Sequence, residues 1–203
     1  MVEESGIMLT KYARWLSSHF IKRGDISEDE REVYDYCFEI FLSTLLNGAF
    51  LIGSGLVLKM PLETLMFIVG FIPFRMVGGG FHSATHLRCF LTLVGVYSVM
   101  IAMIKLIPAD ILNFIAIIFL LIGTVIIYFL SPIEHENNPM DEKTKKKLSE
   151  RAKTLSLLFA FLLIGLNMIL AIQYIFALIY GMFAVAMSLT AVNIIQSRKA
   201  RFF

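Results

Sequence analysis

Residues 111–130 read ILNFIAIIFLLIGTVIIYFL, a run of 20 residues without one charged side chain. About 20 apolar residues are enough for a helix to cross the ~30 Å hydrocarbon layer of a membrane. Five other apolar runs lie along the chain, at residues 38–58, 62–74, 90–107, 155–172 and 174–195. The 203 residues are 58% apolar, with a mean hydropathy of +0.76, which exceeds the usual content of a soluble domain. The sequence therefore predicts an all-α polytopic membrane protein with about six transmembrane helices.

The second run is the shortest, because residues 62–74 supply only 13 positions. The polar stretch 75–89, RMVGGGFHSATHLRC, follows it directly and contains three consecutive glycines. Irregular backbone at membrane depth is tolerated only where protein or a wet cavity surrounds it. We therefore expect a short, broken or tilted second span that is completed by this glycine-rich stretch.

Basic residues are concentrated in alternate connections between the expected spans. Five precede residue 38, two lie within 75–88, six within 131–154 and three after residue 195, which leaves only Lys59 and Lys105 on the other side. Cytoplasmic connections carry the excess of Lys and Arg, so both termini and the loops 75–89 and 131–154 are expected in the cytoplasm. The expected parts are an interfacial segment 1–37, a six-span domain 38–195 and a basic cytoplasmic tail 196–203.

The segment 1–37 is not expected to be a secretory signal, because acidic residues stand among its first four positions and no apolar core precedes residue 38. Apolar and basic residues are interleaved in its first half: Ile7, Leu9, Tyr12, Trp15, Leu16 and Phe20 with Lys11, Arg14, Lys22 and Arg23. This pattern predicts an amphipathic helix that either lies on the membrane or packs on the transmembrane helices. Ser27 and the acidic residues after it predict the capped start of a second helix.

Cys89 is the candidate nucleophile of the stretch 75–89. Ionisable groups at membrane depth are costly and mark functional sites, and Arg75, His82 and His86 precede this cysteine. Positive neighbours lower the pKa of a thiol, and a histidine within reach can act as its base. In one regular helix His86 would be adjacent to Cys89, whereas His82 would lie about 10.5 Å away along the axis. Local geometry alone thus favours His86 as the base.

Three other interpretations of this stretch stay open. His82, His86 and Cys89 could bind a metal ion, although position 83 is serine and not the glutamate of the H-E-x-x-H motif. A non-enzymatic transporter or scaffold could use the glycine-broken segment to line a substrate path. The histidines could also be purely structural. Cys37 has no histidine near it in the sequence and is expected to be inert.

The order Arg75, Gly79-Gly80-Phe81-His82 and Cys89, on a polar break after the second apolar run, resembles the accessory gene regulator B (AgrB) family. Ser131-Pro132 and Asn138-Pro139, ahead of a basic stretch, add to a resemblance that covers about residues 38–155. It implies a membrane cysteine endopeptidase of Gram-positive bacteria that cleaves a short AgrD-like signal-peptide precursor. By the same resemblance His82, and not His86, is the catalytic partner of Cys89, and Arg75, Gly79 and Gly80 support the site.

The resemblance implies a reaction in which the Cys89 thiolate, with His82 as its partner, attacks a backbone carbonyl of the precursor. The histidine protonates the leaving amine, so that the C-terminal segment departs and an acyl thioester remains. A thiol or hydroxyl of the precursor can then close the chain into a thiolactone or lactone. No residue that orients the histidine is identified, and the candidates are Asn47, Asn167, Ser131 and Asp141.

The chain also offers two surfaces to a precursor. Precursors in the resembling family carry an amphipathic leader and an acidic tail, so we expect the leader to bind beside the N-terminal helix. The tail is expected on the basic residues Lys143, Lys145, Lys146 and Lys147. These lysines could instead only set the topology or bind anionic membrane lipid. The resemblance further suggests a homodimer in the cell membrane, and we expect no metal, cofactor or nucleic acid partner.

Overall fold

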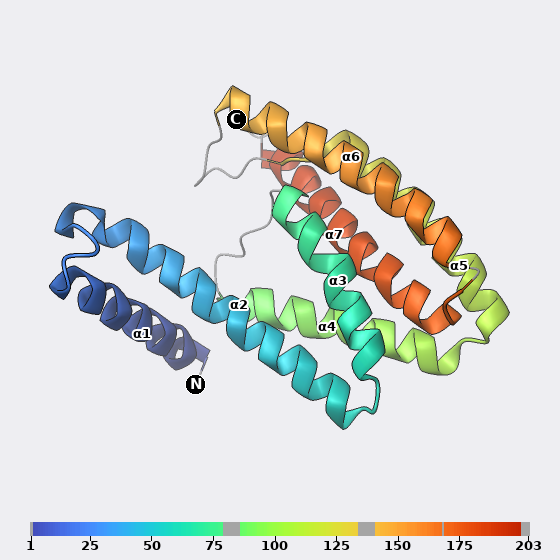
Figure 1. Ribbon diagram of the computed structural model, residues 1–203, viewed down its shortest axis with the longest axis horizontal. Helices are drawn as coiled ribbons and strands as arrows, with labels where there is room; N and C mark the ends of the chain where they lie inside the picture. Colours follow the sequence, from blue (N-terminus) through green and yellow to red (C-terminus); the bar gives the residue numbers. More distant parts are fainter. Residues whose placement is uncertain (1, 79–85, 134–140, 168, 200–203) are drawn as a thin grey trace. The chain divides into compact units, whose positions relative to one another are not determined.

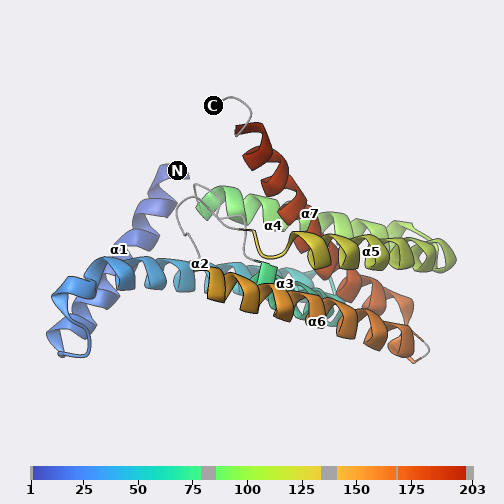
Figure 2. The ribbon, with the colours of Figure 1, turned by 90° about the horizontal axis from the view of Figure 1, so that it is seen from above.

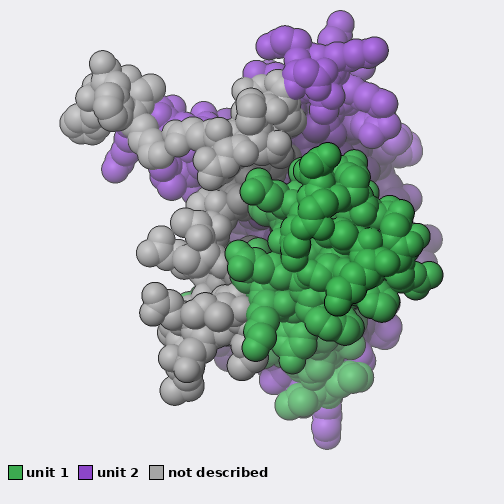
Figure 3. All heavy atoms as spheres, turned by 90° about the vertical axis from the view of Figure 1, so that its left-hand side faces the viewer, with its two compact units in different colours: residues 1–57, 83–95 green, residues 58–82, 96–203 purple. Residues whose placement is uncertain are grey.

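The computed structural model describes residues 2–78, 86–133, 141–167 and 169–199, which form helices joined by short connections and contain no strand (Figure 1). The elements are α1 (Val2–Lys22), the 3₁₀ helix η1 (Glu28–Glu30), α2 (Arg31–Val57), α3 (Pro61–Gly78), α4 (His86–Leu106), α5 (Ala109–Leu130), α6 (Glu142–Leu166) and α7 (Ile172–Lys199). They form two compact units, residues 1–57 with 83–95 and residues 58–82 with 96–203, which Figure 3 colours separately. The predicted all-α architecture is confirmed.

Helix α7 is the core of the larger unit. It packs against α3 and α5, and α6 in turn packs against α5 and α3 (Figures 1 and 2). Every residue from 175 to 182 is buried. Gly70 of α3 faces α7 so closely that a Cβ atom added to it would lie 2.0 Å from the carbonyl oxygen of Leu178. Small residues at a crossing allow two helix backbones to approach in this way, as is common in membrane proteins.

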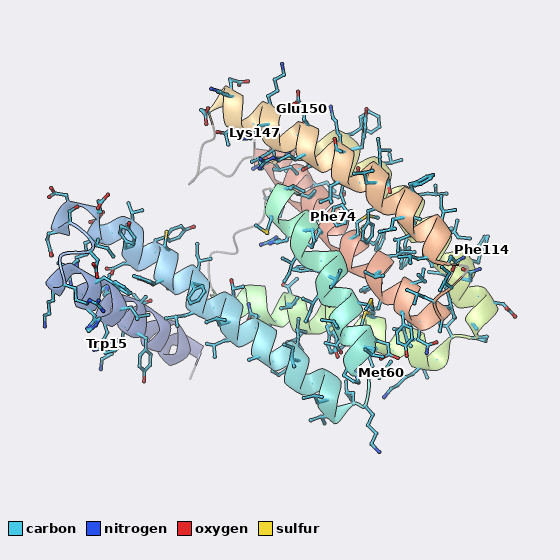
Figure 4. All side chains as sticks on the ribbon, in the orientation of Figure 1. Trp15, Met60, Phe74, Phe114, Lys147 and Glu150 are labelled. Atoms are coloured by element: carbon cyan, nitrogen blue, oxygen red, sulfur yellow. The ribbon has the colours of Figure 1, made fainter. Side chains whose placement is uncertain are left out.

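The outward face of α5 is apolar almost from end to end. Its exposed large side chains are Ile111, Phe114, Ile117, Ile118, Leu121, Ile122, Val125 and Phe129, of which Phe114 is labelled in Figure 4. An apolar face of this length is unfavourable in water, whereas contact with the hydrocarbon of a membrane is favourable for it. The fold therefore presents to its surroundings the kind of surface that lipid covers.

Four of the described helices are long and apolar enough to cross a membrane: Glu28–Val57, Pro61–Gly78, Ala109–Leu130 and Ile172–Arg198. The apolar part of α4, Phe90–Leu106, is a shorter candidate. The chain is thus a membrane protein, as predicted. The number of six spans stays a prediction.

The second expected span is longer and more regular than the sequence suggested. Helix α3 runs without interruption for 18 residues, includes Pro73, and ends only at Gly78. A proline inside a helix lacks one backbone donor and would favour an earlier end. Buried residues lie on both sides of it, however, and Phe67, Phe74 and Gly78 belong to the core of the unit. Packing therefore continues the helix through residues 75–78, which were expected in a loop.

The expected loop 131–154 is also helical over its second half. Asp141 is the N-cap of α6, and its carboxylate accepts a hydrogen bond of 3.2 Å from the backbone N–H of Thr144. The lysine and glutamate residues that follow are good helix formers. The helix ends at Leu166, where the N–H of Asn167 donates to the carbonyl of Leu163 at 3.0 Å. The apolar run 155–172 is therefore the end of α6 plus a connection.

The smaller unit contains the α1–α2 hairpin. Ala13 and Ser17 of α1 are fully buried, and Ser17 Oγ donates a hydrogen bond to the Asp35 carboxylate of α2. On the same α1 helix, Tyr12 and Trp15 are 62% and 64% exposed. Figure 4 labels Trp15 on this helix. The face of α1 that contains the small residues Ala13 and Ser17 thus packs on protein. Its exposed aromatic residues can contact a membrane surface.

The start of α2 follows the sequence pattern. The Glu30 carboxylate accepts hydrogen bonds from the hydroxyl of Ser27 at 2.9 Å and from its backbone N–H at 3.4 Å. The acidic residues of η1 lie at the beginning of this helical segment, where the partial positive charge of a helix N-terminus favours them. The capped start predicted at Ser27 is confirmed.

Candidate active site

The expected catalytic residues lie around the connection between α3 and α4. Arg75 is in the last turn of α3 and is half-buried. Gly79, Gly80 and His82 lie outside the described residues. The roles assigned to these three residues therefore stay predictions.

His86 and Cys89 are described by their backbone alone, in the first turn of α4. Positions three apart on a helix are neighbours on one face, so the backbone places these two residues as the local argument expected. This backbone arrangement leaves the choice between His82 and His86 open.

The C-terminal end of α3 is held by the segment that follows α5. Ser131 Oγ donates a hydrogen bond of 3.0 Å to the carbonyl oxygen of Val77, and the N–H of Ile133 donates one of 3.1 Å to the carbonyl oxygen of Gly78. The last carbonyl groups of a helix have no partner within it and need one elsewhere. Ser131 and Ile133 supply two such partners.

The four candidates for a residue that orients the histidine have different surroundings. Ser131 is the C-cap of α5 and contacts α3, as described. Asp141 and Asn167 cap the two ends of α6, and Asn47 lies within α2. The hydroxyl of Thr144, together with its backbone amide, holds the pKa of the Asp141 carboxyl below its ordinary value of 3.8. Ser131 bonds directly to the helix that carries Arg75.

The basic run lies on the first two turns of α6. Lys143, Lys146 and Lys147 are exposed, whereas Lys145 is half-buried. Figure 4 shows Lys147 and Glu150 on the same helix, so acidic residues interrupt the positive charge. Further along α6, Lys153 Nζ lies 5.2 Å from the centroid of the Tyr128 ring of α5, a cation–π contact.

Cys37 is an exposed free thiol on α2. The side chains that the structure describes include no group of three or more His, Cys, Asp or Glu residues suited to a metal ion. His82, His86 and Cys89 are not among those side chains, so the expectation of no metal stays a prediction.

Two features of this region were not predicted from the sequence. The close approach of α3 to α7 could have been suspected from Gly70, a small residue inside an apolar run. The contact between Ser131 and Val77 joins residues 54 positions apart and has no local signal. A serine before a proline at the end of an apolar run indicates only that the helix stops.

Most of this chain is similar to known proteins. The family model described as "Accessory gene regulator B" matches residues 10–194, a longer stretch than the motif residues alone suggested. A protein of Clostridium perfringens (strain SM101 / Type A) that is described as AgrB-like is 23% identical over 164 residues, which cover 77% of this chain and 75% of that protein. No solved structure is significantly similar to this chain.

Proposed function

This chain belongs to the accessory gene regulator B family, and from that membership we propose that it is a membrane cysteine endopeptidase. Membership itself gives it a role in processing the peptide of agr quorum sensing and a peptide precursor as its partner. The proposal adds the chemistry: cleavage of an AgrD-like precursor through an acyl thioester, followed by ring closure. The observation that carries it is the family match, which spans the whole stretch 75–89 with its histidines and cysteine.

Cys89 is the proposed nucleophile and His82 its base. The thiolate sulfur forms a bond to a backbone carbonyl carbon of the precursor, and the C–N bond to the next residue breaks. The imidazolium of His82 gives its proton to the departing amine. The acyl group is left on the sulfur as a thioester, and a thiol or hydroxyl of the same precursor then displaces Cys89. Placement of Cys89 in the first turn of α4 supports this role, since a helix N-terminus favours a thiolate.

Substrate capture is assigned to two surfaces. The acidic tail of the precursor binds the exposed lysines at the start of α6, Lys143, Lys146 and Lys147. Lys145 contributes less, because it is half-buried. The amphipathic leader binds beside α1, where Tyr12 and Trp15 are exposed and can enter the membrane interface. Both surfaces are placed on the cytoplasmic side of a Gram-positive cell membrane, and the protein acts there as a homodimer.

The test uses the full chain in lipid vesicles with a synthetic precursor. Release of the C-terminal segment is followed by mass spectrometry for wild type, Cys89→Ser, His82→Ala, His86→Ala and Cys37→Ser. We expect Cys89→Ser and His82→Ala to abolish release, and Cys37→Ser to resemble wild type because this thiol lies on α2, in a different helix from Cys89.

Each alternative predicts a different result in this panel. Loss of cleavage in His86→Ala with activity retained in His82→Ala would assign the base to the neighbour of Cys89 on α4. Cleavage that survives Cys89→Ser but is lost with a chelator would replace the thiol mechanism by a metalloprotease. Export of intact precursor with no cleavage by any variant would favour a transporter.

A further inference from the structure

A cavity of about 310 Å³ lies within the larger unit, where the first turns of α3, α5 and α7 meet the last turn of α4. Its volume is at the lower end of the ~300–1,000 Å³ range of small-molecule sites. Glu63 lines it from the first turn of α3, whereas Arg75 is in the last turn of the same helix. Twelve residues of helix, or ~18 Å of rise, separate these two positions. The cavity is therefore distinct from the candidate active site.

The cavity lies where candidate membrane spans begin. Helices α3, α5 and α7 are three of the four described helices that are long and apolar enough to cross a membrane, and each contributes its first turn to the lining. The ends of spanning helices lie at the boundary between the hydrocarbon layer and the polar headgroups. The topology expected from the basic residues places this boundary on the outer side of the membrane. Phospholipid headgroups are thus the molecules most abundant at the cavity.

The lining combines apolar side chains with one carboxylate and one amide. The apolar part includes Ile104, Ile107, Leu112 and Ile172. The polar part is formed by Glu63 and Gln173, both half-buried. A site of this composition suits a molecule with an apolar body and a polar group that the carboxylate can recognise.

The carboxylate of Glu63 is available to such a molecule. Within the part of the chain that the structure describes, its side chain forms no hydrogen bond or ion pair. The buried polar groups beside it are satisfied, since the hydroxyl of Thr64 donates to the carbonyl of Met60 at 2.8 Å and lies 2.6 Å from the hydroxyl of Tyr97. A half-buried carboxylate has lost part of its hydration, so a cation that binds it replaces that loss.

We propose that this cavity binds the headgroup of a phospholipid that carries a primary ammonium group. The ammonium donates to the carboxylate of Glu63, and such charge-assisted hydrogen bonds are among the strong ones. The side-chain amide of Gln173 donates to a phosphate or ester oxygen, and the apolar lining contacts the first methylene groups of the acyl chains. A phospholipid without the ammonium would bring its phosphate to an unpaired carboxylate, which gives the site its selectivity. This binding site does not depend on the proposed peptidase activity.

A purely structural role of Glu63 must be separated from lipid binding. An acidic residue in the first turn of a helix is stabilised by the partial positive charge there, whether or not a ligand binds. Asp110 is the matched control, because it is in the first turn of α5, also at the start of a candidate span, but is exposed and is not among the residues that line the cavity. Asp110→Asn and Glu63→Gln therefore remove the same charge from equivalent helix positions.

The experiment measures lipid binding to the full chain in detergent by native mass spectrometry. The probes are phosphatidylethanolamine and N-acetylphosphatidylethanolamine with identical acyl chains, so that they differ in the ammonium group. We expect wild type to bind phosphatidylethanolamine about fivefold or more tightly than the acetylated lipid, as is typical of a hydrogen bond to a charged group. Glu63→Gln should abolish this preference, and Asp110→Asn should keep it. Equal affinity of wild type for the two lipids, or equal loss of preference in both variants, would overturn the proposal.

A second variant tests the cavity without changing its charge. Ala109 lines the cavity and is exposed, so Ala109→Phe fills the space without removing a group from the core. It should lower the affinity for phosphatidylethanolamine at least as much as Glu63→Gln does, and unchanged binding would place the lipid elsewhere and overturn the assignment. Free ethanolamine distinguishes the source of the ammonium. We expect it not to compete at the concentration at which the lipid saturates the protein, and effective competition would replace the lipid by a soluble amine.

Discussion

Gly70 of α3 and Gly181 of α7 lie against each other's helices with no room for a side chain between them. A Cβ atom on Gly181 would lie 2.5 Å from the carbonyl oxygen of Phe67, and one on Gly70 would lie 2.0 Å from that of Leu178. Both obstacles are backbone atoms, which cannot move aside as a flexible side chain can. The two glycines therefore set the distance between the helix that ends at Gly78 and the core helix of the larger unit.

The first prediction concerns this crossing. Gly70→Ala and Gly181→Ala should each lower the free energy of unfolding by about 1–3 kcal/mol or more, because overpacking forces the backbones apart. Thermal unfolding in detergent would measure the change. Gly165→Ala is the control, since nothing lies within 4 Å of its added Cβ atom. An unchanged melting temperature for Gly70→Ala would show that the two helices do not approach as described.

The sequence predicts the parts of this fold that local residue patterns determine, and it misses the parts that packing between helices determines. The run 111–130 predicted α5 to within two residues, because a long uncharged apolar stretch has few alternatives in lipid. The end of α3 was missed, since Pro73 and Arg75 are local signals of termination that the packing of Phe74 and Gly78 outweighs. The helical start of α6 had a signal in Asp141, a good N-cap ahead of strong helix formers.

In the candidate site, too, some features could be predicted from the sequence and others could not. Cys89, His82 and His86 stand out in the sequence because ionisable groups near membrane depth are costly and mark functional sites. The support that Ser131 gives to Val77 could not be predicted, because it depends on two helix ends meeting in space. Sequence thus points to candidate reactive groups more readily than to a contact between two distant helix ends.

The second prediction concerns topology. In a Cys37→Ser background, single cysteines at Lys59 and Pro108, both exposed, should react with a membrane-impermeant maleimide added outside intact cells. A cysteine at Lys146 should react only after the membrane is permeabilised. Cys89 is present in every variant, so the parent without an added cysteine sets the background. External labelling at Lys146 would contradict a cytoplasmic basic run.

The third prediction concerns the exposed lysines of α6. Charge reversal of Lys143, Lys146 and Lys147 to glutamate should raise KM for the precursor about tenfold while changing kcat little, since each exposed ion pair contributes only ~0–1 kcal/mol. Replacement by glutamine should give an intermediate KM. The wild-type KM should rise with salt, which screens exposed charges. Unchanged kinetics in a correctly inserted triple variant would mean that these lysines serve topology alone.

The last prediction concerns the α1–α2 hairpin. Ser17 is fully buried and its hydroxyl donates to the half-buried Asp35 carboxylate. Ser17→Ala should therefore destabilise the hairpin by about 1–3 kcal/mol, because it removes a donor from a partly buried charge. The neighbouring Ser18→Ala is the control: Ser18 accepts a hydrogen bond from Arg31 at 2.9 Å in a more open place, and its loss should cost about 0.5 kcal/mol or less. Limited proteolysis at the turn around Gly24, which has a φ of +78°, would report the opening of the hairpin. Faster cleavage of Ser18→Ala than of Ser17→Ala would show that α1 is held on α2 by contacts other than the Ser17–Asp35 pair.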